Sequence, residues 1–116
     1  VYYEGLLPLQ NEGYVKLPFI PLYATNNAHM FYIVCRRLEE RSHLIDYLKE
    51  NGIEAVFHYL SLHKSDYYIN KHDGRELSSC DRFANCLVRL PMFYELETDD
   101  AVRIVGLISE FYKNLC

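Results

Sequence analysis

The stretch that decides the fold is Gly52–His63, with the sequence GIEAVFHYLSLH. It follows Asn51, and an Asn-Gly pair is a helix stop because glycine readily adopts the left-handed conformation that ends a helix. Residues 53–59 are rich in β-branched and aromatic side chains, which predicts a buried strand. Two histidines and a tyrosine lie where this strand opens into a loop. We therefore expect any small-molecule site at the end of this strand.

The elements before this strand supply its neighbours. Residues 29–35 (HMFYIVC) are apolar on both faces and predict a strand inside a sheet. Residues 39–51 predict an amphipathic helix, because Leu44, Ile45 and Leu48 share one face at helical spacing. Together with the strand over 53–59, these elements predict a β-α-β unit.

The elements after this strand cover the loop and close the core. Residues 60–77 are polar and irregular, and a loop of this length in a compact domain is usually functional or mobile. A short helix capped by Ser78 or Ser79 is expected to end at Cys86. A third strand is expected over 87–90, where a proline follows.

The two ends of the chain differ in regularity. Residues 1–13 predict only remnants of a helix, since Gly5 and Pro8 interrupt the pattern, and residues 17–22 predict an extended connector with two prolines. The last helix is expected to start with Thr98 as its N-cap. Its apolar stripe consists of Ala101, Ile104, Val105, Ile108, Phe111 and Leu115. The predicted fold class is α+β, a small mixed or antiparallel three-stranded sheet with helices packed on one face.

Composition and charge exclude several classes of protein. A chain of 116 residues fits one domain with a real core. The net charge of −4 argues against a nucleic-acid partner. We also expect no membrane partner, because no apolar run is long enough to span a bilayer and the N-terminus carries no signal-peptide pattern. The chain begins without a methionine, which we read as a cut from a longer protein.

Two groups of residues are interpreted without a special role. The basic residues Arg36, Arg37 and Arg41 are interspersed with Glu39 and Glu40, a pattern typical of a solvated helix start. The four cysteines form no Cys-x-x-Cys pair, which favours reduced thiols in a cytoplasmic protein over a zinc or redox site; they are Cys35, Cys80, Cys86 and Cys116.

The candidate binding residues are His58, Tyr59, His63 and His29. Neutral imidazoles and a phenol offer hydrogen bonds to a polar, anionic or hydroxylated ligand without a fixed charge. The alternative for His58 and His63 is one satisfied buried histidine and one histidine in solvent. His29 faces the same cleft if the strands are neighbours, and otherwise is a strand-edge residue in water. No carboxylate or cysteine stands at metal-ligand spacing, so no metal site is expected.

The chain carries no complete set of catalytic residues. It has no glycine-rich phosphate loop, no Gly-x-Ser-x-Gly sequence and no cysteine–histidine signature. None of its lysines stands in an apolar context that would lower the pKa of the amine. The residues alone therefore predict a small α+β domain with one loop that is a candidate for binding a polar ligand.

Four stretches in order resemble a known family: HMFYI (29–33), RSHLIDYLK (41–49), AVFHYLSLH (55–63) and RLPMFY (89–94). They are similar to the C-terminal domain of the nucleotide-sugar aminotransferases of the DegT/DnrJ/EryC1/StrS family. The start, YYEGLLPL, also resembles the end of the interdomain helix of such enzymes. The resemblance covers nearly the whole chain.

The resemblance implies a pyridoxal-phosphate (PLP) enzyme with the aspartate aminotransferase fold, fold type I. Residues 1–22 would form the end of the interdomain helix and a connector, and residues 23–116 the small domain. The large PLP-binding domain, with the lysine that binds the cofactor, would lie outside this chain, which alone would be inactive. Glutamate would donate the amine to a 4-keto nucleotide sugar, in a homodimer with active sites between subunits.

The family motif His-Tyr-x-Pro-Leu-His falls on residues 58–63, which implies that His58, Tyr59 and His63 line the substrate site. Ser61 stands where many members have proline. Two other classes of function remain: a freestanding ferredoxin-like regulatory module that binds a small molecule, and a dimerisation domain that uses its tyrosines.

Overall fold

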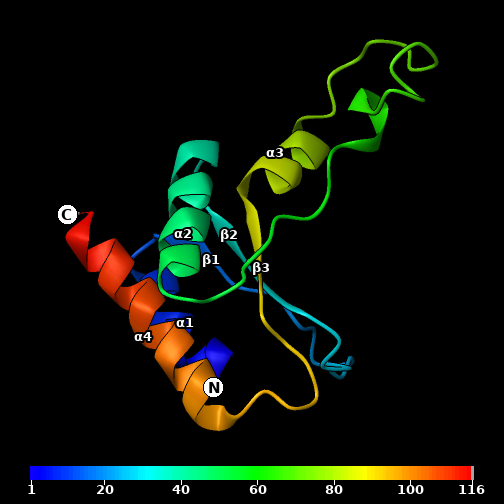
Figure 1. Ribbon diagram of the computed structural model, residues 1–116. Helices are drawn as coiled ribbons and strands as arrows, with labels where there is room; N and C mark the ends of the chain where they lie inside the picture. Colours follow the sequence, from blue (N-terminus) through cyan, green and yellow to red (C-terminus); the bar gives the residue numbers. More distant parts are fainter. Residues whose placement is uncertain (116) are drawn as a thin grey trace.

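The computed structural model describes residues 1–115 and contains helices on a small sheet (Figure 1). Cys116 lies outside the described residues, so the expectation of a reduced thiol there is not addressed. In chain order, the elements are α1 (Tyr2–Asn11), β1 (Val15–Lys16), β2 (Phe31–Cys35), α2 (Leu38–Glu50), the 3-10 helix η1 (Leu62–Lys64), α3 (Ser78–Cys86), β3 (Leu87–Leu90) and α4 (Thr98–Asn114).

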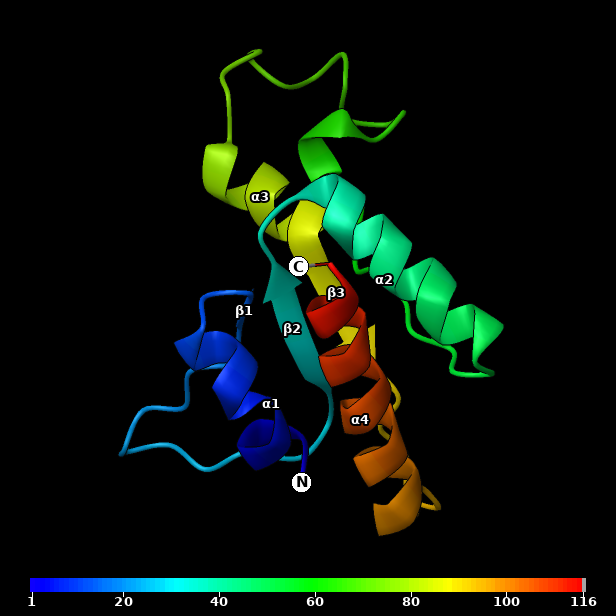
Figure 2. The same cartoon turned by 90° about the vertical axis from the view of Figure 1, so that its left-hand side faces the viewer.

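The sheet has three strands in the order β1-β2-β3, and both pairs are antiparallel. Phe31 of β2 pairs with Leu90 of β3, and Ile33 pairs with Val88. These four side chains are buried in the core, which α1, α2 and α4 close from one face of the sheet (Figure 2). The predicted fold class, α+β with a three-stranded sheet and helices on one face, is confirmed.

The prediction of a strand over residues 53–59 is wrong. Only Val56 bonds to the sheet, through two backbone hydrogen bonds with Arg89 of β3 (2.7 and 3.1 Å). Alternate residues of a strand present their backbone groups to opposite neighbours, so Leu87 and Arg89 are the residues of β3 that face outward. The N–H of Leu87 is already donated to the carbonyl of Phe83 at the end of α3.

The next position along β3 is Pro91, which has no N–H to donate. Arg89 is therefore the one residue of β3 with both backbone groups available for an outer neighbour, and the ladder stops after one bridge. Strand β2, helix α2 and the extended segment around Val56 still form a β-α-β crossover. Strand β3 lies between β2 and that segment in the sheet.

The N-terminal helix α1 is more regular than predicted. Neither Gly5 nor Pro8 interrupts it, and Tyr2, Leu6 and Leu9 form its buried face. Gly5 lies against α4 so closely that an added Cβ would stand 2.7 Å from Cγ1 of Val105. The glycine that looked like a helix breaker therefore permits close packing of two helices.

The interpretation of the charged run as a solvated helix start is wrong for two residues. Glu40 is 4% exposed and Arg41 is 9% exposed. Both lie on the side of α2 that also carries the buried residues Leu44 and Leu48. Their spacing of three or four residues from Leu44 was the sequence signal that they are buried.

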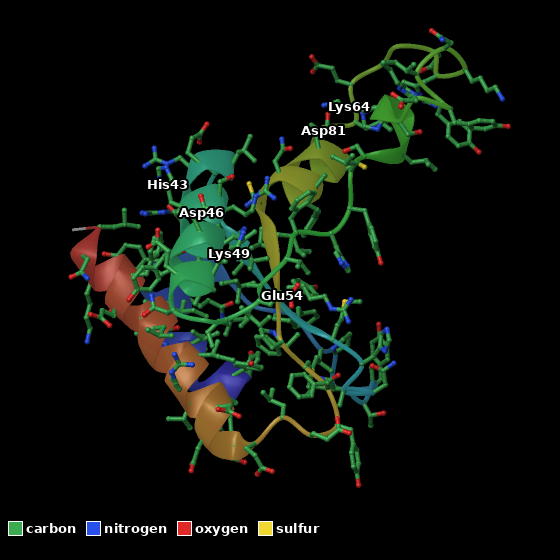
Figure 3. All side chains as sticks on the ribbon, viewed as in Figure 1. His43, Asp46, Lys49, Glu54, Lys64 and Asp81 are labelled. Atoms are coloured by element: carbon green, nitrogen blue, oxygen red, sulfur yellow. The ribbon has the colours of Figure 1, made fainter. Side chains whose placement is uncertain are left out.

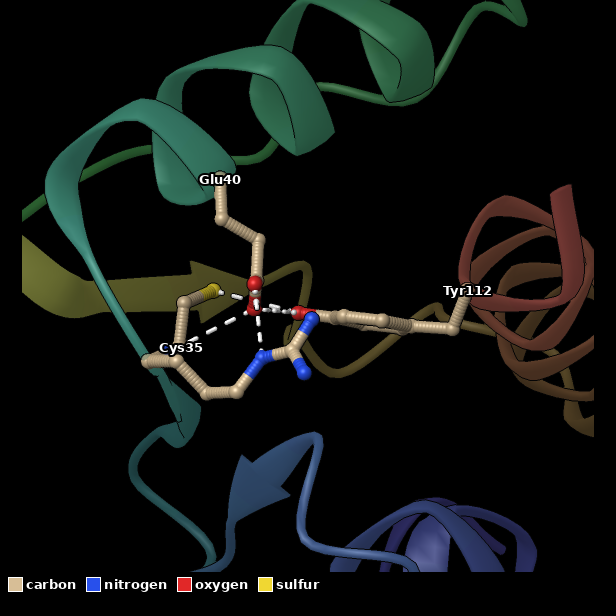
Figure 4. A network of polar contacts seen from close by, with 4 residues as sticks. Cys35, Glu40 and Tyr112 are labelled. Atoms are coloured by element: carbon tan, nitrogen blue, oxygen red, sulfur yellow. Dashed lines mark hydrogen bonds and ion pairs between the residues drawn. The ribbon is translucent and has the colours of Figure 1, made fainter. Parts of the chain in front are cut away.

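Glu40 belongs to a buried polar network that joins α2 to α4 and β2 (Figure 4). Its carboxylate accepts a hydrogen bond from the hydroxyl of Tyr112 (2.9 Å) and one from Nε of Arg36 (2.8 Å). The Tyr112 hydroxyl also lies 3.5 Å from the sulfur of Cys35. The network fixes the C-terminal half of α4 against the start of α2.

The remaining helix predictions are confirmed with shifts at their ends. The predicted helix over 39–51 is α2, and α3 begins at Ser78 and ends at Cys86. Neither α3 nor α4 has a side-chain N-cap hydrogen bond, and the cap of α4 is Glu97 instead of Thr98. The α4 stripe is buried except for its edges, where Val105 is half-buried and Leu115 is exposed. None of the described helices combines the length and the apolar character that a bilayer span requires.

We predict opposite effects for alanine at two helical glycines. Gly5→Ala forces a methyl group into the stiff Val105 side chain and lowers the free energy of unfolding by about 1–3 kcal/mol. Gly106→Ala, where an added Cβ meets nothing within 4 Å, raises it by about 0.4–1 kcal/mol. Urea unfolding of both variants measures the difference, and equal effects would contradict the close contact between α1 and α4.

Alkaline pH should weaken the fold through its buried ionisable groups, among them Cys35 and Tyr2. Burial raises the pKa of Cys35 to about 12 from 9.0, and burial followed by the charge of Asp100 raises the pKa of Tyr2 to about 12 from 10.0. A folded-state pKa above the unfolded one stabilises the fold fully below the unfolded value, and that contribution is lost as the pH rises toward 12.

The urea midpoint should therefore fall as the pH rises above 9, the unfolded value for the thiol. Cys35→Ala makes the fall shallower because one of these buried groups is removed. Cys80→Ala is the matched control, since that thiol is exposed. A midpoint that stays constant throughout this window would contradict the prediction.

Candidate functional site

The candidate segment leaves the sheet after Val56. It runs past α2 to η1, and the following loop projects away from the body beside α3 (Figure 1). Residues 57–60 make no backbone–backbone hydrogen bond in the described chain. The segment is thus extended, but it does not belong to the sheet.

His58 and Tyr59 form a stacked pair at the start of this segment. Their ring centroids are 4.2 Å apart with an interplanar angle of 23°. Tyr59 is 72% exposed, whereas His58 is half-buried. Nδ1 of His58 is buried and has no hydrogen-bond partner. The pair therefore offers an open aromatic face and one unused polar atom.

His58 lies at one end of a groove between α2 and residues 52–58. The groove has a volume of about 710 Å³, and Ile45 and Lys49 of α2 form its other wall. A second cavity of about 500 Å³, toward α4, shares the residues Gly52–Glu54 and Val56 with it. Figure 3 shows Lys49 and Glu54, which give the groove one charge of each sign.

His63 lies in different surroundings from His58. Its Nε2 is 3.3 Å from Oδ1 of Asp81, and its ring is 5.1 Å from the ring of His72. The side chain is 10% exposed, and its Nδ1 is buried without a hydrogen-bond partner. The described structure shows no contact between the rings of His58 and His63, so the two histidines are not brought together.

Asp81 of α3 connects the His63 loop to the body of the protein. Its carboxylate accepts a hydrogen bond from the Ser61 hydroxyl (2.8 Å) and lies 3.0 Å from the ammonium of Lys64 (Figure 3). The hydrogen bond from Lys64, followed by that from Ser61, holds the pKa of Asp81 below its usual value. The carboxylate is therefore ionised at neutral pH and ties three loop residues to one helix.

His29 lies at the opposite end of the sheet from His58. Arg89 of β3 pairs with Tyr32 of β2 on one side and with Val56 on the other, so the three residues lie at the same level of the sheet. The segment after Val56 and strand β2 both run antiparallel to β3, so His58 lies beyond this level in one direction and His29 in the other. His29 is exposed, and its N–H is donated to the side chain of Asn27 (3.2 Å).

The unpartnered polar atoms of the described side chains gather at the candidate segment. Buried polar groups in native proteins are almost always hydrogen-bonded. The buried side-chain nitrogen and oxygen atoms without a partner are Arg41 Nε, His58 Nδ1, His63 Nδ1 and Ser65 Oγ. Three of them lie within residues 58–65, and the guanidinium of Arg41 lies 4.6 Å from the ring centroid of Phe57.

Sequence reasoning did not identify Arg41 or Asp81 as parts of the site. The helical spacing of Arg41 from Leu44 and Leu48 was a usable signal for burial. For Asp81 there was none, because the contact with Ser61 joins residues 20 positions apart through an irregular loop.

The lysines of the described chain do not fit the role of a cofactor-binding amine. A lysine that forms a Schiff base with a carbonyl cofactor needs a desolvated or otherwise depressed amine. All five lysines are exposed: Lys16, Lys49, Lys64, Lys71 and Lys113. Residues 1–115 therefore do not themselves supply an anchor for pyridoxal phosphate.

The sequence matches a family model described as the DegT/DnrJ/EryC1/StrS aminotransferase family over residues 1–109. The fold is similar to that of DesV from S. venezuelae, solved in complex with a ketimine intermediate, with 26% identity and a TM-score of 0.84 over 95% of this chain and 29% of that one. It is similar to the aminotransferase TlmJ from Streptoalloteichus hindustanus, with 20% identity and a TM-score of 0.84 over 98% of this chain and 30% of that one.

NtdA from Bacillus subtilis, solved with bound cofactor PMP, shares 23% identity and a TM-score of 0.82 over 97% of this chain and 26% of that one. The protein Spr1654 from Streptococcus pneumoniae is described in a PLP form. The cofactor expected from the sequence, pyridoxal phosphate, is thus confirmed as the type that these structural relatives carry.

This chain spans about 30% or less of the length of each of the three aligned relatives. The match over residues 1–109 shows that the chain belongs to the DegT/DnrJ/EryC1/StrS aminotransferase family.

Proposed function

We propose that the chain is the C-terminal small domain of a PLP-dependent nucleotide-sugar aminotransferase. Residues 1–22 form the end of an interdomain helix and its connector, and residues 23–116 form the small domain. The observation that carries the proposal is the family match over residues 1–109 on a chain in which three of the four buried, unpartnered side-chain atoms of the described residues lie within residues 58–65. The family match does not favour a freestanding regulatory module.

The reaction that we propose moves an amino group from glutamate to a 4-keto-6-deoxy nucleotide sugar. The substrate is dTDP-4-keto-6-deoxyglucose and the product dTDP-4-amino-4,6-dideoxygalactose, for lipopolysaccharide, enterobacterial common antigen or a related cell-surface polysaccharide. The support is the order and spacing of the motifs, which resemble those of dTDP-4-amino-4,6-dideoxygalactose transaminase. This chain alone is inactive, since none of its described lysines is placed to bind the cofactor.

Pyridoxal phosphate supplies the carbanion chemistry in this proposal, and a large domain outside these 116 residues holds it. The residues of this chain bind and orient the sugar nucleotide. Nδ1 of His58, with no partner of its own, accepts a hydrogen bond from a substrate hydroxyl. The exposed ring of Tyr59 packs against the substrate, and His63 lines the approach to it. His29, which the sequence also offered as a site residue, lies at the opposite end of the sheet and takes no part in this proposal.

The active enzyme in this proposal is a cytoplasmic homodimer. The loop that projects from the body exposes several large apolar side chains, which suit burial against another subunit or domain: Tyr59, Leu60, Leu62, Tyr67 and Ile69. The three described cysteines are free thiols, which persist in a reducing compartment.

Alanine substitution of the site histidines in the intact protein tests the function. His58→Ala and His63→Ala each raise KM for the nucleotide sugar by about 10-fold, the equivalent of one lost hydrogen bond of about 1.4 kcal/mol. KM for glutamate and the visible absorbance of the bound cofactor stay unchanged. His43→Ala is the matched control, since that histidine is exposed on α2. Unchanged kinetics in both site variants would remove these residues from the substrate site.

We further predict that Asp81 holds the loop that carries His63. Asp81→Asn removes the charge that attracts Lys64 and His63, so backbone amides of residues 61–72 exchange hydrogen faster. Because the folded-state pKa of Asp81 is lowered, its contribution is complete above the ordinary value of 3.8 and is lost as the pH falls below it. Asp66→Asn is the control, an exposed carboxylate in the same loop. Equal exchange in the two variants would show that Asp81 does not hold the loop.

A further inference from the structure

Arg41 is a buried cation without a counter-ion. It is 9% exposed, and none of the ion pairs among the described residues includes it. Its Nε is buried and donates no hydrogen bond. Burying an unpaired charge is unfavourable, so the position of this guanidinium requires another explanation than an ion pair.

The contact that Arg41 does make is with the candidate segment. Its guanidinium carbon lies 4.6 Å from the centroid of the Phe57 ring, within the range of a cation–π interaction. Arg41, Ile45 and Lys49 follow one another at i+4 spacing, so Arg41 continues the row of α2 that forms the wall of the 710 Å³ groove. The contact therefore joins α2 to the residue that precedes His58.

Few other interactions hold this part of the chain. Ile53 and Ala55 are buried, and Val56 makes the single bridge to Arg89. Beyond Val56, the described chain has no backbone–backbone hydrogen bond before Ser61. The contact with Phe57 is thus the next attachment after the bridge, and it stands immediately before the His58–Tyr59 pair.

We propose that Arg41 is a positioning residue for the ligand-binding pair His58 and Tyr59. A planar guanidinium on the Phe57 ring fixes where the backbone turns away from the sheet. Successive side chains of an extended segment point to opposite sides, so the orientation of Phe57 determines that of His58. This inference deepens the proposed function and rests on it for the identity of the ligand.

Two substitutions in the intact protein test the proposal. Arg41→Met keeps the length and apolar bulk of the side chain but removes the charged plane, and Arg41→Lys keeps the charge alone. We expect KM for the nucleotide sugar to rise about 3- to 10-fold in Arg41→Met, with a smaller rise in Arg41→Lys. KM for glutamate should stay unchanged. Arg37→Met, at the exposed N-cap of α2, is the matched control.

A purely structural role would lower the melting temperature without altering KM when the assay is run well below that temperature. Wild-type KM in a folded Arg41→Met protein would therefore overturn the proposal.

If the intact protein has no sugar-nucleotide activity at all, the proposed function fails, but the positioning role is still measured by NMR of ¹³C-labelled histidine. The His58 ring signal, shifted by the stacked Tyr59 ring, should move in Arg41→Met and stay in Arg37→Met. An unmoved signal in Arg41→Met would overturn the positioning role.

Discussion

The outer edge of β3 is the constraint on which the site depends. A strand of four residues has two that face outward, and the N–H of one of them, Leu87, is already bonded to α3. Pro91 follows the strand and has no N–H to offer. Only Arg89 accepts a neighbour, so the chain that returns from α2 touches the sheet at Val56 and then leaves it. The same short strand that completes the core therefore releases the segment that carries His58.

The buried polar groups around Glu40 in the core have hydrogen-bond partners, whereas several of those on the segment that leaves the sheet have none. Inside the core, Glu40, Tyr112 and Arg36 form a network in which the buried carboxylate has its donors. At the released segment, Nδ1 of His58 and Nδ1 of His63 have none. A half-satisfied network weakens a core, whereas a complete one gives a single well-ordered packing. The buried carboxylate of Glu40 thus has its donors, whereas the unsatisfied histidine nitrogens lie on the segment that leaves the sheet.

The sequence predicted the parts of this fold that depend on local periodicity. The helices α2 and α4 and the strands β2 and β3 follow from apolar spacing, and the structure contains them within one or two residues of their predicted ends. It did not predict that residues 53–59 stay outside the sheet, because strand propensity at 53–59 says nothing about the edge available on β3. Gly5 was read as a breaker because its contact with Val105, 100 positions away, cannot be seen in a local pattern.

The candidate site shows the same division between local and distant information. The two histidines were found from their place after a β-rich stretch, and the structure leaves a buried nitrogen unpaired on each. The two rings make no contact with each other, since His63 is held by Asp81 from α3 and His58 by its stacking on Tyr59. A buried acceptor without a donor costs about 1–3 kcal/mol, a sizeable part of the stability of a small domain. A ligand that supplies a donor to each histidine recovers that free energy. The nucleotide sugar that we propose as the substrate has hydroxyl groups on both sides of its diphosphate and can supply such donors.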